Sequence, residues 1–340
     1  MSSYKVLHKQ NFENGNFSIV PIRFEDRMDI MKWRNEQIYH LRQENPISEK
    51  HQNNYFTNVI GKLFDQDQPN QILFSFLEKS KCIGYGGLVH INWVNKNAEV
   101  SFIMQTNYEK ERFEEIWAAF LLLLEEVAFL DLKLVKIFTY AFDLRPKLYP
   151  VLILAGFNEE SRLSDHCFFE GKYIDVVIHS KINANFLSHR KALPKDVKLY
   201  FDWANDPLVR EQSYKSKFIN FETHSQWFEN KLNDSLCLML IFINHQNIII
   251  GQLRIQKTSN NNSLIGISIG SNHRGNGYSK EMLQIGANYF LLDNPDFTIN
   301  AFIKQTNLSS KYAFEKAGFE LKDIVIHEGS NSFHFIKKTP

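Results

Sequence analysis

Residues 264–280 read LIGISIGSNHRGNGYSK and place a β-branched strand, a glycine-containing turn and a helix start in direct succession. Gly275 and Gly277 allow the backbone to turn so that several N–H groups converge on one point. The helix that follows adds the positive end of its dipole to the same point. The stretch therefore predicts a binding site for a pyrophosphate group.

The spacing of this loop excludes two common nucleotide sites. An NTP-binding P-loop needs a Lys-Ser or Lys-Thr pair after a four-residue gap, and residues 270–280 carry neither that pair nor the glycine spacing of a dinucleotide site. The pyrophosphate of coenzyme A is the remaining candidate. Taken alone, residues 275–277 also fit an ordinary tight turn, so the interpretation depends on the preceding strand, Arg274 and a second helix start at Asn307.

The composition is that of an ordinary globular protein. The 340 residues carry a net charge of +1 at pH 7, with 44% hydrophobic and 23% charged residues. A near-neutral chain lacks the basic footprint of nucleic-acid binding, and a chain of this length usually forms two domains. We therefore expect two cores and a small-molecule partner, and no nucleic-acid partner.

Cysteine usage and hydropathy indicate a reducing compartment. Cys82, Cys167 and Cys237 are isolated and show neither metal-ligand nor redox spacing, so no metal site is expected. The most apolar segment, residues 116–135, is interrupted by three carboxylates, and the first residues lack the apolar run of a signal peptide. The sequence therefore predicts a cytoplasmic protein without membrane insertion.

Short stretches of the first half return in the second half in the same order. An ordered series of four pairs is much harder to attribute to chance than any single match. We interpret the series as an internal duplication. The pairs are residues 33–36 (WRNE) and 203–206 (WAND), 47–56 and 219–228, 83–84 and 250–251 (both IG), and 154–157 (LAGF) and 316–319 (KAGF).

Each half has the residue pattern of an α/β unit. Asn307 is suited to cap the start of the last helix, and Gly318 is suited to end it in a left-handed conformation. The polar run 180–194 lacks periodicity and predicts the linker, which gives domains 1–182 and 183–340. In the second half we expect strands at residues 238–243, 248–257, 264–270, 297–303 and 323–326, and helices near 223–233, 279–292 and 309–317.

These motifs resemble the GCN5-related N-acetyltransferase (GNAT) superfamily, and the chain looks like two such domains in tandem. Residues 272–277 are similar to the family's Q/R-x-x-G-x-G/A loop, with Asn272 where the family has Gln or Arg. The segment from Asn307 to Gly318 and Phe319 is similar to its Asn-helix-Gly-Phe ending. The resemblance implies two domains with mixed, mostly antiparallel sheets flanked by helices, and acetyl-CoA as co-substrate without a metal.

A narrower resemblance concerns the acceptor side. Residues 203–210 and 219–228 are similar to acetyltransferases that modify the 4-amino group of nucleotide-linked sugars, as in the pseudaminic acid pathway. This implies a small amine substrate, a nucleotide-linked amino sugar for surface-glycan biosynthesis. Ribosomal-protein and antibiotic acetyltransferases share a loosely similar tryptophan segment, so acetylation of a protein N-terminus remains an alternative.

The resemblance also implies where acetyl-CoA binds. The strand residues Ile267, Ser268 and Ile269 would pair with the pantetheine amides, and backbone N–H groups of the glycine loop would hold the pyrophosphate. A peptide N–H beside the strand would stabilise the oxyanion that forms during transfer. The expected cofactor-binding residues are Ile267, Ser268, Ile269, Arg274, Gly275, Asn276, Gly277, Tyr278, Ser279, Asn307 and Phe314.

The acid and the base of the reaction are less clearly marked. Many family members protonate the leaving thiolate with a tyrosine at the place of Phe314, and Tyr312 lies about 200° around the helix from there. His224 is the first candidate for a base or a sugar contact, or it packs against Trp227 and Phe228 on the same helix face. Glu222 is a weaker candidate that suits the helix dipole better. The expected substrate-binding residues are Asn205, Arg210, Tyr214 and Trp227, although a solvated helix and loop would explain the first three nearly as well.

The first half lacks the loop at the corresponding junction. Residues 104–115 contain no glycine and four carboxylates, which neutralise the helix dipole and repel a pyrophosphate. Arg145 and Pro146 occupy the place that matches Asn307. We therefore expect a degenerate first domain that does not bind acetyl-CoA and acts as a scaffold or substrate lid.

Two classes of function follow from this sequence. In the first, the chain is an N-acetyltransferase whose second half carries the site. In the second, it is a non-catalytic binding or assembly module, which the missing tyrosine favours. The retained Arg274, both glycines of the loop and Asn307 favour the enzyme.

Overall fold

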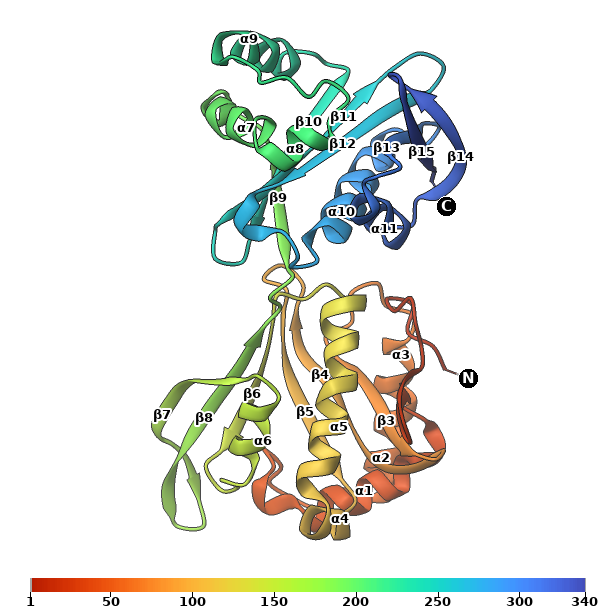
Figure 1. Ribbon diagram of the computed structural model, residues 1–340. Coiled ribbons are helices and arrows are strands. Elements are labelled where there is room, and N and C mark those ends of the chain that lie inside the picture. Colours follow the sequence, from red (N-terminus) through yellow and green to blue (C-terminus); the bar gives the residue numbers. More distant parts are fainter. Residues whose placement is uncertain (1, 340) are drawn as a thin grey trace. The chain divides into compact units, whose positions relative to one another are not determined.

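The computed structural model describes residues 2–339 and divides the chain into two compact units. The first ends at Asn183 and the second begins at Ala184. Each unit consists of one sheet with helices packed against it (Figure 1). Within residues 2–339, no helix is both long enough and apolar enough to cross a bilayer.

The first unit contains an eight-stranded sheet with helix α5 packed along its length (Figure 1). Its strands are β1 (Phe12–Asn14), β2 (Phe17–Pro21), β3 (Ile72–Glu78), β4 (Lys81–Asn92), β5 (Asn97–Met104), β6 (Lys136–Phe142), β7 (Asn158–Phe169) and β8 (Lys172–Ile182). Its helices are α1 (Arg27–Glu36), α2 (Glu49–Tyr55), α3 (Gly61–Leu63), α4 (Thr106–Glu111), α5 (Phe113–Glu125) and α6 (Leu148–Leu154).

The second unit contains a seven-stranded sheet with helices on both faces. Its strands are β9 (Leu187–Lys191), β10 (Cys237–Asn244), β11 (Ile249–Lys257), β12 (Asn262–Ile269), β13 (Thr298–Lys304), β14 (Glu320–His327) and β15 (Ser330–Lys337). Its helices are α7 (Val197–Ala204), α8 (Pro207–Gln212), α9 (Phe221–Leu232), α10 (Tyr278–Asp293) and α11 (Leu308–Lys316).

The two sheets have the same topology. The first runs β1-β2-β3-β4-β5-β6-β8-β7, and the second, without an equivalent of β1, runs β9-β10-β11-β12-β13-β15-β14. In each sheet the parallel pairing joins the fourth and fifth shared strands, β5 with β6 and β12 with β13. All other recorded pairings are antiparallel. The expected α/β fold with two tandem units of mostly antiparallel sheet is confirmed.

An asparagine clamp appears in both units and supports the internal duplication. Asn35 donates to the carbonyl of Ile47 at 2.9 Å and accepts from its N–H at 2.7 Å. Asn205 makes the same two bonds with Ile219, at 3.0 and 2.9 Å. These residues stand at corresponding places in the aligned stretches, so the two halves share side-chain contacts as well as strand order.

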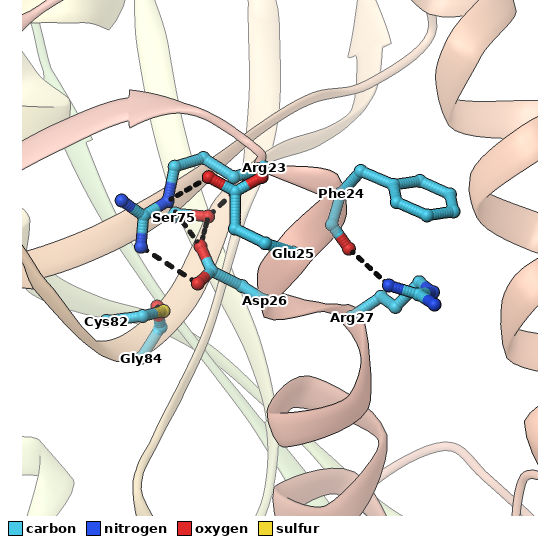
Figure 2. Close-up of polar contacts among 8 residues, drawn as sticks. All are labelled: Arg23, Phe24, Glu25, Asp26, Arg27, Ser75, Cys82 and Gly84. Atoms are coloured by element: carbon cyan, nitrogen blue, oxygen red, sulfur yellow. Dashed lines mark hydrogen bonds and ion pairs between the residues drawn. The ribbon is translucent and has the colours of Figure 1, made fainter.

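A buried aspartate paired with a half-buried arginine is the second shared feature. Asp26 accepts two bonds from Arg23, at 2.7 and 2.8 Å, and one from the Ser75 hydroxyl at 2.6 Å (Figure 2). In the second unit, Arg190 makes the same two-pronged contact with Asp196, at 2.6 and 2.8 Å. Bidentate pairs of this kind fix geometry well, and here each one anchors the turn that precedes the first helix of its unit.

Two helical layers enclose the second sheet. Leu240, Phe242, Leu253 and Ile255 pack with α10 and α11 on one face, whereas Met239 and Ile241 pack with Tyr200 of α7 and Phe228 of α9 on the other. Side chains alternate between faces along a strand. The face under α9 therefore also receives Gln252 and Arg254 of β11, because they lie opposite Ile241 and Met239 in the register.

The run 180–194, in which the sequence analysis placed the seam between the halves, contains secondary structure. It includes the end of β8 and all of β9, so only residues 183–186 separate the two strands. Strand β9 pairs with β10 through its backbone at the edge of the sheet. An edge strand with one covered side does not need the apolar alternation that marks an interior strand.

Strand β15 was also missed by the sequence analysis. It follows β14 through a turn in which Glu328 and Gly329 both have positive φ values, 45° and 77°. Such hairpin turns are usually signalled by Asn-Gly or Asp-Gly, and glutamate rarely takes the left-handed position. The predicted final strand at 323–326 is therefore only the middle of a longer β14.

Candidate active site

The site begins where two parallel strands separate. Strands β12 and β13 pair only between Asn262–Leu264 and Thr298–Asn300. Beyond Leu264 the backbone of β12 is bonded to β11 on one side, and its other side faces the opening between the strands. Ile267, Ser268 and Ile269 lie on this free edge, where an extended ligand can add its own hydrogen bonds to the strand.

A cavity of about 790 Å³ opens at this separation. It is lined by residues from β11, β12 and β13 and from helices α7 to α11. All of the lining belongs to the second unit. The volume is in the range of sites that hold a cofactor or a drug-sized molecule.

The glycine loop adopts the conformation that its sequence requires. Gly275 and Gly277 have φ values of +80° and +79°, and Gly277 directly precedes α10. A Cβ at either glycine would meet no heavy atom within 4 Å, so glycine is needed for its backbone angles and not for space. Gly275 and Ser279 line the cavity, whereas Asn276 and Gly277 are exposed to solvent. Tyr278 opens α10 and packs partly against the core.

Arg274 fastens this loop to its surroundings. Its Nε donates to the carbonyl of Ile269 at 3.2 Å, and its Nη2 lies 2.8 Å from a carboxylate oxygen of Asp206. The guanidinium thus joins the end of β12 to the start of α8. Part of its charge is compensated inside the protein, so its role includes shaping the loop.

Helix α11 begins at the cavity. The Asn307 side chain accepts a bond from the N–H of Ser310 at 3.1 Å, which confirms it as the N-cap, and Gly318 ends the helix with a φ of +79°. Phe314 borders the cavity and is buried against Phe319, with ring centres 4.9 Å apart. Tyr312 is 54% exposed and is absent from the cavity lining. The tyrosine acid of the family is therefore not replaced by this neighbour.

His224 is the one predicted base that reaches the cavity. It is only 2% exposed, and neither ring nitrogen has a hydrogen-bond partner within residues 2–339. Burial and the nearby charge of Arg210 lower the pKa of His224, so the ring is neutral at pH 7. The ring also packs against Phe201 and Trp227, with centres 5.6 and 5.3 Å away. The His224 ring therefore packs against aromatic neighbours while both of its nitrogens stay without a hydrogen-bond partner.

The other predicted acceptor residues fall into two groups. Arg210 and Trp227 line the cavity. Asn205 holds Ile219, and the Tyr214 hydroxyl lies 2.8 Å from that of Ser332, so both side chains are used inside the protein. Glu222 is exposed in the first turn of α9, outside the cavity lining. Asn205 and Tyr214 therefore hold the segments around the cavity in place, and Glu222 lies outside it.

Asn205→Ala tests this structural role. The substitution removes two hydrogen bonds and should lower the free energy of unfolding by about 2 kcal/mol. We expect a lower urea midpoint for Asn205→Ala and an unchanged midpoint for the exposed Asn230→Ala on α9. An unchanged midpoint together with a raised KM for the amine would instead make Asn205 a substrate contact.

The sequence analysis missed several polar residues of the cavity, three of which come from strands. Gln252 and Arg254 of β11 and Lys304 at the end of β13 line it. On β11, Gln252 and Arg254 alternate with Leu253 and Ile255, which are fully buried in the core. This alternation was visible in the sequence, but only the packing of α9 shows that the polar side faces a cavity.

The corresponding place in the first unit is filled by charged side chains. Strands β5 and β6 also pair over three residues only. At the end of β5, however, the buried Glu109 lies 3.5 Å from Arg145 and 3.3 Å from Lys147. Gln37 donates to the carbonyl of Met104 at 2.8 Å. These contacts stand where the second unit has its glycine loop and the start of α11.

The first unit also lacks the candidate base. Gln52 stands at the place of His224 in the aligned stretches, and it is buried with its amide donating to the carbonyl of Arg27 at 2.8 Å.

No group of three or more His, Cys, Asp or Glu side chains within the described residues could hold a metal ion.

Comparisons with known proteins complete the description. The chain is similar to a spermidine N-acetyltransferase from Vibrio cholerae in complex with CoA and spermine (14% identity, 44% of this chain and 94% of that chain, TM-score 0.41). It is similar to an aminoglycoside acetyltransferase in complex with coenzyme A and kanamycin (15% identity, 45% and 94%, TM-score 0.39). No curated protein sequence matches the chain.

Family models match both units. One model described as an acetyltransferase (GNAT) domain matches residues 19–178, and a second model with the same description matches residues 187–320. The predictions of an acyltransferase and of two tandem domains of this family are thereby confirmed. The chain belongs to the GNAT acetyltransferases and carries two of their domains in succession.

Proposed function

We propose that residues 183–340 transfer the acetyl group of acetyl-CoA to the amine of a small molecule. One observation carries the proposal. The separation of β12 and β13 opens into a cavity that is lined both by the glycine loop and by the unpartnered His224. Both reactants therefore have a place at one opening.

The residues of the cavity fit the steps of acetyl transfer. The free edge of β12 suits the amides of pantetheine, and the N–H groups of residues 274–279 suit the pyrophosphate. The amine nitrogen attacks the thioester carbonyl, the C–S bond breaks, and the sulfur leaves as thiolate or takes a proton from water. His224, neutral at pH 7, accepts the proton that the amine loses. Positioning supplies most of the acceleration, because a sugar amine is partly neutral near pH 7.

We further propose that the amine belongs to a nucleotide-linked sugar used for surface glycans, acetylated in the cytoplasm. The resemblance of residues 203–210 and 219–228 to such enzymes supports this substrate. Arg210 and Trp227 from these stretches both line the cavity. A guanidinium and an indole suit a diphosphate and a base or sugar ring.

An assay of thiol release from acetyl-CoA tests this function. The panel consists of UDP- and dTDP-linked 4-amino sugars, together with peptides that carry a free N-terminus. Turnover with one of the sugars is the expected result. Turnover with peptides alone would indicate a protein N-terminal acetyltransferase, and tight acetyl-CoA binding without turnover on any amine would indicate a binding module.

The first unit should not take part in acetyl-CoA binding. Its Glu109, Arg145 and Lys147 form a charged cluster at the junction that corresponds to the glycine loop and the start of α11, and Gln37 donates to the carbonyl of Met104 at the end of β5. Calorimetry on the full chain should therefore give one acetyl-CoA per chain. A stoichiometry of two would contradict the proposed role of residues 1–182 as scaffold or lid.

A further inference from the structure

The charges around the cavity are all of one sign. Four cationic side chains line it: Arg210, Arg254, Arg274 and Lys304. Among residues 2–339, no aspartate or glutamate belongs to the lining. The chain as a whole is nearly neutral, so this excess is a property of the cavity.

Three of these four cations have no carboxylate partner within the described residues. Arg274 is paired with Asp206. Arg210 donates to two backbone carbonyls and to the hydroxyl of Ser213, and its Nε remains without a partner. Lys304 donates to the carbonyls of Glu211 and Ser213. Neutral acceptors of this kind solvate a cation but do not cancel its charge.

Arg254 is placed for a ligand on the acceptor side. Its guanidinium lies 5.3 Å from the centre of the Trp227 ring, and an aromatic face likewise leaves the charge uncompensated. Gly266 stands opposite Arg254 in the register and has no atom within 4 Å of its Cβ position. The space above Gly266 is therefore open beside the guanidinium.

The unpartnered polar atoms at the same place also indicate a ligand. Both ring nitrogens of the buried His224 and the side-chain oxygens of Gln212 and Gln252 lack hydrogen-bond partners. All three residues line the cavity. Buried polar groups normally have hydrogen-bond partners, so these unpartnered groups indicate that a polar ligand binds here.

We propose, resting on the function above, that the acceptor amine carries an anionic group bound by Arg254 and Arg210. The group is a phosphate or a carboxylate. Polycationic amines are rejected, because an additional ammonium would lie near three uncompensated cations without any carboxylate to bind it. The selection depends on charge in the cavity and holds whatever scaffold carries the amine.

Matched amines and the full chain test this proposal. Glucosamine, glucosamine 6-phosphate, glucosaminic acid, a UDP-linked amino sugar, spermidine and kanamycin are compared by kcat/KM at fixed acetyl-CoA. We expect the anionic amines to exceed glucosamine at least tenfold and the polyamines to fall below it. The phosphate and carboxylate compounds identify which anion is preferred.

Variants of Arg254 separate charge from packing. Arg254→Gln should reduce the preference for the anionic amine over glucosamine at least tenfold, Arg254→Glu should reverse it, and Arg254→Lys should retain most of it. The exposed Lys322→Gln removes a charge outside the cavity and should leave the preference unchanged. Circular dichroism verifies that each variant is folded.

Two outcomes would overturn the anion proposal. One is a kcat/KM for spermidine or kanamycin above that of the anionic amines, and the other is an unchanged preference in folded Arg254→Gln. Calorimetry with acetyl-CoA distinguishes failure of the anion proposal from failure of the proposed acetyltransferase function. Normal cofactor binding and turnover without anion preference would remove only the substrate class, whereas absent cofactor binding would remove both.

Discussion

Gly277→Glu should abolish acetyl-CoA binding while leaving the second unit folded. Gly277 has a φ of +79° and directly precedes α10, so under the proposed function its neighbours supply the N–H groups that bind the pyrophosphate. A glutamate adds a negative charge at that point and forces a side chain into a left-handed conformation. We expect affinity for acetyl-CoA and kcat/KM to fall at least 100-fold, measured by calorimetry and by thiol release.

Gly329→Glu provides the matched control in the same unit. Gly329 has a φ of +77° and open space around its Cβ position, but it lies in the β14–β15 turn, outside the cavity lining. The backbone strain of about 1–2 kcal/mol is thus shared by the two variants, whereas the charge at the cofactor loop is not. Retained acetyl-CoA binding in folded Gly277→Glu would place the cofactor elsewhere.

His224→Gln should reduce kcat/KM about 100-fold at pH 7.5, the lower range for loss of a general base. The substitution copies the first unit, where Gln52 stands at the same place in the aligned stretches and is buried with its amide hydrogen-bonded to the carbonyl of Arg27. The fold should therefore tolerate it. KM for acetyl-CoA should not change, since the proposed mechanism assigns His224 to the amine and not to the cofactor.

The pH dependence distinguishes a base from a packing residue. Burial and the charge of Arg210 lower the pKa of His224 below its usual value near 6.5, so wild type keeps a neutral base down to that lowered pKa. The ratio of kcat/KM between wild type and His224→Gln should be constant above pH 6.5 and fall as pH drops through the lowered pKa. Taking the ratio cancels ionisation of the substrate amine.

His51→Gln is the control for this experiment, because His51 is exposed on α2 of the first unit. Its kcat/KM should follow wild type at every pH. A ratio near one at all pH values for His224→Gln would reduce His224 to a packing residue. Acetyl transfer would then depend on positioning and water alone.

The local features of this site could be predicted from the sequence, because the conformational preferences of single residues determine them. Gly275 and Gly277 take the left-handed angles that glycine permits, and Asn307 and Gly318 bound α11 as their residue types predict. The duplication was also visible in the ordered matching stretches, and the aligned residues Asn35 and Asn205 make the same clamp in the structure. Each of these rules acts over a few residues, so no knowledge of distant contacts is needed.

An edge strand and a turn with an unusual residue could not be predicted from the sequence in the same way. Strand β9 lies within the run that the sequence analysis assigned to a linker, and the Glu328-Gly329 turn concealed β15. Strand β9 pairs with β10, about 50 residues further along the chain, and β15 pairs with β13 as well as with its hairpin neighbour β14. Their side chains carry too little alternation to reveal that pairing.

The sequence alone determined the fold class, the family resemblance and the glycine loop before α10, because spacing and residue type decide those features. Only the tertiary structure decided that β12 and β13 separate after three residue pairs and that His224 keeps both nitrogens free. It also decided that Arg210, Arg254 and Lys304 gather around one cavity without a carboxylate. These properties arise from contacts between segments up to a hundred residues apart, and charge compensation exists only once those segments have packed together.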